Sequence, residues 1–412
     1  MHIVFLNTAG QIGGAERSLL DLIFSLRQAQ PAWQFTVIAG ETGPFSNACE
    51  EIGAHALAMD MPSDLARLGD FALSGASGRK QFRAVLAGRL ALSGFSALRY
   101  GCRLRRLLSD LKPDLVHTNG LKMHLFGGWA TPLYVPLVWH IHDYVSPRPV
   151  MVRLLRMSIR RCDAAVVNSE SVGKDFQLAL APRIPIHTVS NGIDLKEFSA
   201  DGPKLDLDAA CQLPPSKEEL VRIGLVGTFG KHKGHHTFLE ALALLPSDLA
   251  FRAYVVGGPL YRTDASQWSL ADLKNHASRL GLSKRVGFTG FVSKPAAAMR
   301  SLDIVVHATT QPEPFGLVIA EAMACRRALT ASRAGGAMEV FCEGVNALGH
   351  SPGDVQDLAG AIVRLASDSN LRRTLGDAGR RTAERYFNRE RLGGQLISIY
   401  RSMSPLTSRQ TA

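Results

Sequence analysis

Short apolar runs alternate along the chain with longer stretches of helical spacing. The first run, Ile3-Val4-Phe5-Leu6, is contiguous, as expected for a strand buried on both faces. The glycine-containing stretch 7–14 follows, and residues 15–22 have the spacing of a helix. A strand, a glycine loop and a helix in this order open a parallel α/β sheet. Comparable strand-like runs recur at 35–39, 115–117, 137–139, 164–167 and 187–189.

A second series of the same kind begins after the polar, proline-containing stretch 199–217. Its strand-like runs lie at 223–227, 254–258, 286–288, 304–306 and 327–329, with a helical stretch at 236–245. Two consecutive series predict two doubly wound α/β domains that face each other across a cleft. Ligands of such sheets bind at the carboxyl ends of the strands.

Composition narrows the class of protein. Hydrophobic residues make up 46% and charged residues 20% of the 412 positions, which is typical of a globular chain and excludes a disordered one. The apolar run 125–141 is interrupted by Pro132 and Pro136 and predicts no membrane-spanning helix. The N-terminus lacks the pattern of a signal peptide. Six scattered cysteines without a C-x-x-C pair argue against a disulfide framework or zinc site, and predict reduced thiols of a cytoplasmic protein.

The charge is strongly basic and unevenly distributed. The net charge of +11 favours an anionic partner. Residues 71–109 contain eight Lys or Arg and no Asp or Glu, and Arg99, Arg103 and Arg106 share one helical face. Residues 151–162 repeat this arrangement. Two interpretations stay open, a peripheral contact with anionic lipid or a solvated face over a buried stripe. Nucleic acid is not expected, because no aromatic stacking surface accompanies the charge.

Several motifs then occur in a fixed order. They are Gly13-Gly14-Ala15-Glu16, Asn191-Gly192-Ile193-Asp194, Lys233-Gly234, the block from Glu313 to Ala324 (EPFGLVIAEAMA), Gly335-Gly336 and Glu343-Gly344-Val345-Asn346. Together they resemble glycosyltransferase family 4, the retaining nucleotide-sugar transferases of the GT-B fold. The resemblance covers residues 3 to 400, and the block that begins at Glu313 is its most specific part.

The resemblance implies a domain plan and a reaction. Residues 1–194 would form a Rossmann-like domain on the acceptor side, residues 195–383 a Rossmann-like domain that binds the nucleotide sugar, and residues 384–412 a helix that crosses back to the first domain. The reaction would move a sugar from a UDP- or GDP-linked donor to a glycan or lipid-linked acceptor, in cell-envelope polysaccharide or glycolipid synthesis. It would retain configuration and require no metal or other cofactor. The place expected for it is the cytoplasm, at the inner face of the cell membrane.

Two glutamates are the main candidates for the donor site. Pro314 and Gly316 place Glu313 in a loop, and Glu321 in the first turns of a helix that begins between Phe315 and Val318. In the family, the second glutamate binds both ribose hydroxyls and the first lies beside the donor sugar. A fixed negative charge there stabilises an oxocarbenium-like transition state. The donor-nucleotide site predicted as a whole comprises Gly13, Gly14, Thr228, Lys233, Val292, Phe315, Gly316, Leu317, Val318 and Glu321.

Lys233 follows a strand and a glycine, where its ammonium would stabilise the leaving diphosphate. The family usually has an arginine directly after the strand-end glycine, and this chain has Thr228 there. Lys231 could replace that arginine in part. Gly13 and Gly14 at a helix N-terminus would let the backbone approach an anion.

In the family a histidine at the end of the strand that corresponds to 137–139 reaches the donor sugar, so the resemblance makes His142 a catalytic candidate with Glu313 and Lys233. A capping or core histidine is the alternative interpretation. Glu16 and Asn119 occupy comparable loop positions on the acceptor side. The cluster His232, His235 and His236 has a spacing that does not let three imidazoles face one metal ion.

Two other functions fit the same fold. A sugar-nucleotide epimerase would carry different acid and base residues and need no acceptor. A catalytically weak scaffold that binds membranes is the second alternative, suggested by Thr228.

Overall fold

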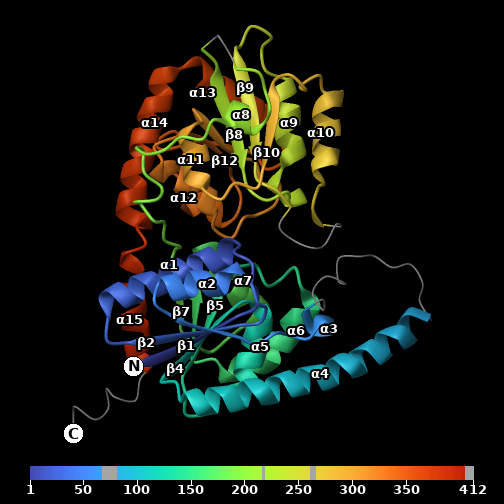
Figure 1. Ribbon diagram of the computed structural model, residues 1–412, viewed down its shortest axis with the longest axis vertical. Coiled ribbons are helices and arrows are strands. Elements are labelled where there is room, and N and C mark those ends of the chain that lie inside the picture. The colour runs from blue at the N-terminus through green and yellow to red at the C-terminus, as the bar shows by residue number, and fades with distance from the viewer. Residues whose placement is uncertain (67–80, 216–218, 260–265, 404–412) are drawn as a thin grey trace. The chain divides into compact units, whose positions relative to one another are not determined.

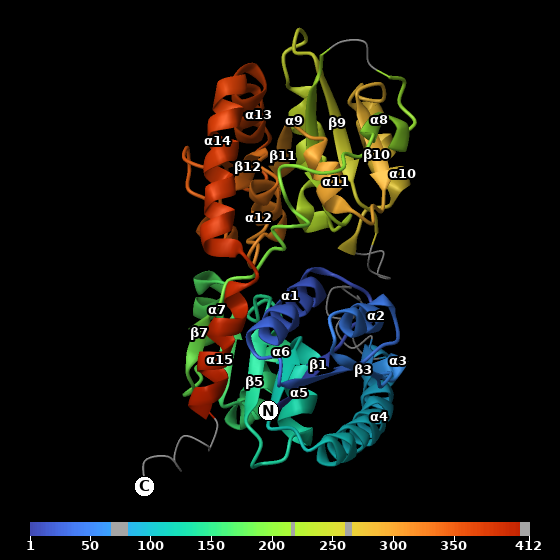
Figure 2. The ribbon, with the colours of Figure 1, turned by 60° about the vertical axis from the view of Figure 1, so that its left-hand side comes forward.

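The computed structural model describes residues 1–66, 81–215, 219–259 and 266–403. Part of the basic stretch (71–80) and the end of the predicted third region (404–412) lie outside the described residues. The chain divides into two units, Met1–Gly192 with Glu390–Ala412, and Ile193–Arg389 (Figures 1 and 2).

The first unit contains a seven-stranded parallel sheet in the order β3-β2-β1-β4-β5-β6-β7. Its strands are β1 (His2–Asn7), β2 (Gln34–Ala39), β3 (His55–Ala58), β4 (Leu115–Asn119), β5 (Leu137–Ile141), β6 (Ala164–Val167) and β7 (Ile186–Thr188). The helices are α1 (Gly14–Ala29), α2 (Pro44–Glu51), α3 (Ser63–Ala66), α4 (Gln81–Leu111), α5 (Leu121–Ala130), α6 (Pro149–Ser158), the 3-10 turn η2 (Ile159–Arg161), α7 (Glu170–Leu180) and α15 (Arg391–Met403).

The second unit contains a six-stranded parallel sheet in the order β10-β9-β8-β11-β12-β13, the strand order of a dinucleotide-binding fold. Its strands are β8 (Val221–Val226), β9 (Phe251–Val256), β10 (Val286–Gly290), β11 (Ile304–His307), β12 (Ala328–Ser332) and β13 (Leu348–His350). The helices and turns are α8 (Leu207–Ala210), η3 (Lys231–Lys233), α9 (His235–Ala243), α10 (Leu270–Arg279), α11 (Pro295–Arg300), α12 (Leu317–Ala324), η5 (Gly336–Glu339), α13 (Val355–Ser367), α14 (Ser369–Thr382) and η6 (Ala383–Phe387).

Both sheets are covered by helices on their two faces, which explains the contiguous apolar runs. Every residue of β4, β5, β6 and β11 is buried, because a strand between two helical layers has no face turned to water. Two short strands, β3 and β13, were not predicted, since runs of three or four residues carry little periodicity.

The last helix belongs to the first unit. Its Gly393 packs so closely on α1 that a Cβ would lie 2.5 Å from the Ser25 carbonyl oxygen. The Gly393 N–H donates to the Ser25 hydroxyl (2.7 Å), and buried Tyr400 hydrogen-bonds His117 of β4 (2.7 Å). The single helix expected from residue 384 onward is divided, because η6 ends at Phe387 and α15 starts only at Arg391.

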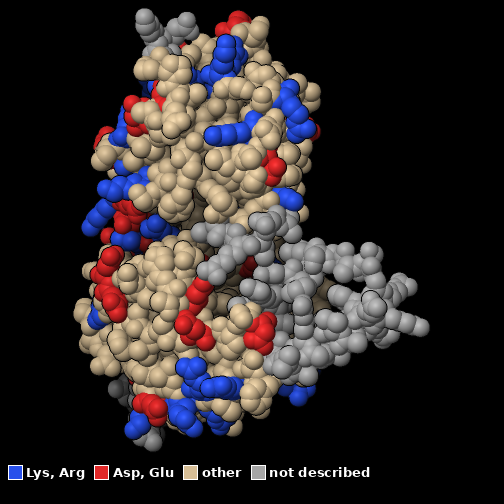
Figure 3. Space-filling model, turned by 45° about the vertical axis from the view of Figure 1, so that its right-hand side comes forward, with Lys and Arg blue, Asp and Glu red and all other residues tan. Residues whose placement is uncertain are grey.

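The basic face predicted for residues 99–106 is exposed in α4. Arg99, Arg103 and Arg106 are exposed, while Leu104 and Leu108 are buried on the opposite side of the helix. Lys and Arg side chains gather along the edge of the first unit where α4 lies (Figure 3). The amphipathic pattern is therefore confirmed, with Leu104 and Leu108 in the buried stripe of α4.

Candidate active site

A tight turn carries Lys233 at the carboxyl end of β8. Residues 231–233 form the 3-10 turn η3, which Gly234 closes with φ 73°. A Cβ at Gly234 would lie 1.8 Å from the Ala308 carbonyl oxygen. The Thr310 N–H donates to the His232 carbonyl oxygen (2.9 Å). Gly234 thus lets the lysine turn pack directly on the loop that follows β11, where Glu313 lies.

Glu313 meets Lys233 in that loop. The Lys233 Nζ donates to both carboxylate oxygens of Glu313, at 2.7 and 3.0 Å, and His307 Nε2 lies 3.7 Å from Glu313 Oε2. The side chains of Glu313 and Lys233 are 13% and 25% exposed. An ammonium has three N–H groups, so Lys233 keeps one for an anion beside this pair.

Glu313 is held in its ionised form. Burial by itself would raise the pKa of this carboxyl, but the Lys233 ammonium and the hydrogen bond and charge of His307 outweigh burial. They hold the pKa of Glu313 well below its usual range. A fixed, desolvated negative charge of this kind can stabilise positive charge that develops next to it.

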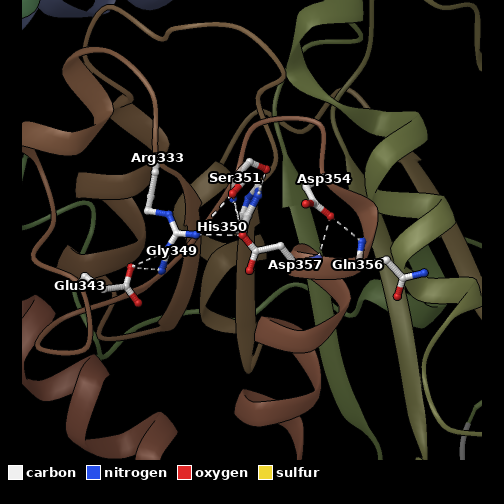
Figure 4. Close-up of polar contacts among 8 residues, drawn as sticks. All are labelled: Arg333, Glu343, Gly349, His350, Ser351, Asp354, Gln356 and Asp357. Carbon is white, nitrogen blue, oxygen red and sulfur yellow. Dashed lines mark hydrogen bonds and ion pairs between the residues drawn. The ribbon is translucent and has the colours of Figure 1, made fainter.

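A polar network fixes the loop against which Glu313 rests. Glu313 forms a parallel bridge with Gly335, just after Arg333 leaves β12. The Arg333 guanidinium donates to Asp357 at the start of α13 (2.9 Å), and Asp357 also accepts from the N–H (2.7 Å) and hydroxyl (2.9 Å) of Ser351 (Figure 4). These contacts tie β12, the β13 end and α13 together behind Glu313.

The predicted helix start after Pro314 is confirmed, since α12 begins at Leu317. Gly316 is its N-cap with φ 89°, a conformation that favours glycine. Glu321 lies in the second turn and is half-buried, as are Leu317 and Val318. Phe315 is buried against Phe387, with ring centroids 5.7 Å apart. The side chain of Phe315 is therefore part of the core and not available to a ligand.

Three further donor-side positions lie around the same sheet edge. Thr228 is half-buried in the loop after β8, and Val292, beyond β10, packs partly against the core. The Lys231 ammonium lies 4.9 Å from the centre of the Trp268 ring, as a cation–π contact. This contact holds Lys231 on the α10 side of the turn, so it is a weaker candidate than Lys233 for a diphosphate ligand.

In the first unit, Gly13 and Gly14 start α1 as predicted. Gly13 is the N-cap, and its N–H donates to Glu16 Oε2 (3.1 Å). Burial raises the pKa of Glu16, and the opposing effect of this hydrogen bond and of one from Asn7 does not cancel the rise. Glu16 therefore has a structural task at the start of the helix in addition to the acceptor-side role predicted for it.

A chain of side-chain hydrogen bonds reaches His142 from the end of β1. Asn7 Nδ2 donates to the Ala9 carbonyl oxygen (2.8 Å), which leaves Asn7 Oδ1 to accept from Asn119 Nδ2 (2.6 Å). Asn119 Oδ1 must then accept from His142 Nε2 (2.5 Å). The proton of His142 is thereby assigned to Nε2. Its Nδ1 is buried without a hydrogen-bond partner among the described residues, so it carries a free lone pair.

Three buried histidines, His117, His124 and His140, lie near this chain, and half-buried His142 is at its end. The rings of His140 and His142 lie 4.0 Å apart, and His117 and His140 lie 5.2 Å apart. Burial lowers the pKa of His142 to about 4 and that of His117 to about 3, and it also lowers the pKa values of His124 and His140. All four are neutral near pH 7. His142 can therefore accept a hydrogen bond there but does not act as a cation.

These lowered pKa values predict that the folded protein becomes less stable as the pH falls. Below about pH 6.5 the unfolded chain binds protons that the folded chain excludes, so the free energy of unfolding falls with falling pH. Each histidine contributes up to about 1.4 kcal/mol per pH unit, until the pH reaches the folded-state pKa, about 4 for His142. Urea unfolding at pH 7 and 5 measures this loss. Between these two pH values we expect the His140→Leu variant to lose less stability than the wild type. Equal losses would contradict the lowered pKa of His140 in the folded protein.

A group with metal-ligand chemistry lies apart from Glu313. Ligand atoms of His236, Glu240 and His276 lie within 4.8 Å of one another. However, the two imidazole rings are stacked, with centroids 4.0 Å apart and planes 11° from parallel. An imidazole binds a metal in its ring plane, and one ion cannot lie in two parallel planes. His236 also stacks on Trp268 (3.9 Å), so this arrangement serves packing.

The structure brings Lys233 and Glu313 into contact, and it brings Asn119 to His142. These two groups belong to different units. Sequence analysis did not single out His307 or Asn7. Each is the last residue of a strand, and a polar residue at the carboxyl end of a buried parallel strand is the signal that could have found them.

Comparison with known proteins finds glycosyltransferase matches in both units of the chain. Residues 12–197 match the Glycosyltransferase Family 4 and residues 212–382 match the Glycosyl transferases group 1. A D-inositol 3-phosphate glycosyltransferase of Xylanimonas cellulosilytica is 30% identical over 318 residues, 70% of this chain and 71% of that protein. The lipopolysaccharide core biosynthesis mannosyltransferase LpcC of Rhizobium leguminosarum bv. viciae is 31% identical over 250 residues, 60% of this chain and 66% of LpcC. The chain thus spans just under two thirds of the length of LpcC.

A solved structure extends the likeness to almost the full length. HepE of Anabaena, crystallised in complex with UDP-glucose, has a TM-score of 0.79 and 26% identity over 98% of this chain and 100% of HepE. The family matches, the 30% identity and this fold confirm the resemblance carried by the motifs. The chain belongs to glycosyltransferase family 4, and its two Rossmann-like units have the GT-B fold.

Proposed function

We propose that the protein is a retaining glycosyltransferase that moves a sugar from a nucleoside diphosphate sugar to a hydroxyl of a glycan or lipid-linked glycan. The observation that carries the proposal is the contact between Lys233 and Glu313 at the carboxyl edge of the second sheet. This contact supports the proposal because a cation can stabilise a leaving diphosphate and an adjacent anion can stabilise an oxocarbenium-like sugar. The names of relatives that act in lipopolysaccharide core biosynthesis support an acceptor of the cell envelope.

Each residue of the proposed site has its own role in the transfer reaction. Glu321 binds the ribose hydroxyls, and the N–H groups at the start of α12 lie next to it in the chain. Lys233 uses its remaining N–H on the diphosphate, and Glu313 faces the sugar ring. His142 accepts a sugar hydroxyl at its free Nδ1. Lys233 and backbone N–H groups supply the positive charge, so the proposed reaction needs no metal.

HepE binds UDP-glucose, so a UDP-linked hexose is the first donor to test. Thermal shifts with UDP and GDP identify the base, because a ligand that binds only the folded state raises the melting temperature. Release of sugar or its transfer from UDP-glucose then tests the reaction. Conversion of the donor to an epimer without transfer would instead support the epimerase alternative. Absence of a shift with both nucleotides would contradict the proposed donor site.

The ribose contact predicts a loss of affinity. We expect Glu321→Gln to weaken UDP binding at least about tenfold, because charge-assisted hydrogen bonds of about 1.5–3 kcal/mol each become neutral or are lost. Titration calorimetry measures this change. The control is Glu240→Gln, in the histidine group on α9, which should bind UDP like the wild type. Equal affinity of Glu321→Gln and wild type would place the ribose elsewhere.

A further inference from the structure

Three helices form one continuous layer on the first sheet. Tyr100 of α4 packs edge-on against Phe126 of α5, with ring centroids 4.9 Å apart. Gly101 of α4 lies against the Trp129 ring. On the other side of α5, Gly128 lies against Ser158 of α6. The two basic stretches noted in the sequence, one in α4 and one in α6, therefore flank a common neighbour and share one outer surface.

This outer surface exposes large apolar side chains. Six of them are Leu98 of α4, Trp129 of α5, Leu133 and Tyr134 of the loop after α5, and Leu154 and Met157 of α6. Leu133 is 83% exposed, and Tyr134 and Met157 are each 78% exposed. They are additional to the buried stripe, which α6 forms with Val152 and Leu155. Several exposed apolar residues in one place mark an interaction surface.

The same surface is basic. In the described side chains of α4, α5, α6 and η2, Asp110 is the only acidic residue, and exposed arginines include Arg103, Arg153 and Arg160. The basic edge of the first unit is visible where α4 lies (Figure 3). Arginine stems can lie along apolar surface while their guanidinium groups reach phosphates.

We propose that the outer surface of α4, α5 and α6, with the loop at Leu133 and Tyr134, docks on an anionic lipid bilayer. Apolar tips enter the acyl boundary while arginines pair with lipid phosphates. A second copy of the chain fits less well, because two like basic faces would repel each other. A nucleic acid would leave Leu133, Leu154 and Met157 without an apolar partner. Among the described residues, no helix has the length and apolar character needed to cross a membrane, so the contact is peripheral.

Vesicle sedimentation tests the proposal, with vesicles of phosphatidylcholine alone and of equal parts phosphatidylcholine and phosphatidylglycerol. The full chain should pellet with the anionic vesicles and be released as salt rises. The double variant Leu133→Ser/Tyr134→Ser should partition at least about tenfold more weakly, because two buried apolar contacts are lost. The control Leu244→Ser, 47% exposed at the end of α9 in the other unit, should bind like the wild type.

Charge reversal at Arg153→Glu/Arg160→Glu should also release the protein from anionic vesicles. The proposal is overturned if neutral vesicles bind the wild type equally. It is also overturned if the Leu133/Tyr134 variant binds like Leu244→Ser, or if a single-stranded oligonucleotide competes the protein off the vesicles. Thermal shift with UDP checks that each variant is folded. A failure of lipid binding with an intact UDP shift leaves the proposed transferase reaction standing, so the two proposals fail separately.

Discussion

Lys233→Ala should lower kcat at least about 100-fold. Lys233 is the cation that the structure places beside Glu313, and the leaving diphosphate gains charge as the glycosidic bond breaks. Loss of one charge-stabilising donor in a preorganised site costs on the order of 100-fold in kcat. An interaction that strengthens in the transition state lowers kcat and kcat/KM together. Steady-state transfer assays with the donor that the wild type accepts measure both constants.

Lys231→Ala is the matched control. It removes a lysine two positions away, whose ammonium lies over Trp268, and should leave kcat within about threefold of the wild type. Adding Thr228→Arg to Lys233→Ala should restore part of the activity, because it returns the arginine usual in the family. Near-normal turnover of Lys233→Ala, or a larger loss in Lys231→Ala, would move the diphosphate site away from this turn.

Most of the fold could be predicted because its signals are local. Strands buried on both faces appear as contiguous apolar runs, and both series of runs became strands of parallel sheets, among them the edge strands β7 and β10. The short edge strand β13 could not be found, since its three residues are fixed by pairing with β12 rather than by a pattern of their own. The break between η6 and α15 could not be predicted for the same reason. It occurs where Asn388 pairs with Ile193, and these residues lie near the two ends of the second unit in the sequence.

The sequence could indicate candidate residues for the site but not the contacts among them. The motif gave Glu313 and Lys233 separate roles, while their direct pairing depends on Gly234 packing against Ala308. These two residues lie in loops that follow β8 and β11 and are far apart in the sequence. Likewise, His142 was singled out from its strand end. Its tautomer depends on Asn119 and Asn7, which come from two other strands. Spacing along one segment carries no information about such neighbours.

The pairing predicts a distinct behaviour for Glu313→Gln, a substitution that keeps the volume and removes the charge. We expect kcat to fall at least about 100-fold, because the fixed anion beside the sugar is lost. UDP affinity should stay near that of the wild type, the opposite of Glu321→Gln. Since Lys233 and His307 hold the pKa of Glu313 well below its usual range, its charge persists in mild acid. Any fall in wild-type kcat between pH 7 and 5 should therefore come from other groups.

Coupling between the two residues distinguishes catalysis from mere support of the fold. If Lys233 and Glu313 act as one unit, the double variant Lys233→Ala/Glu313→Gln should lose little more than the worse single variant. Independent roles would instead multiply the two losses to about 10,000-fold. A structural role would appear in the melting temperature, because a buried charge left without its partner destabilises the fold. Unchanged kcat in Glu313→Gln together with a lowered melting temperature would show that the pair supports the loop and that the sugar lies elsewhere.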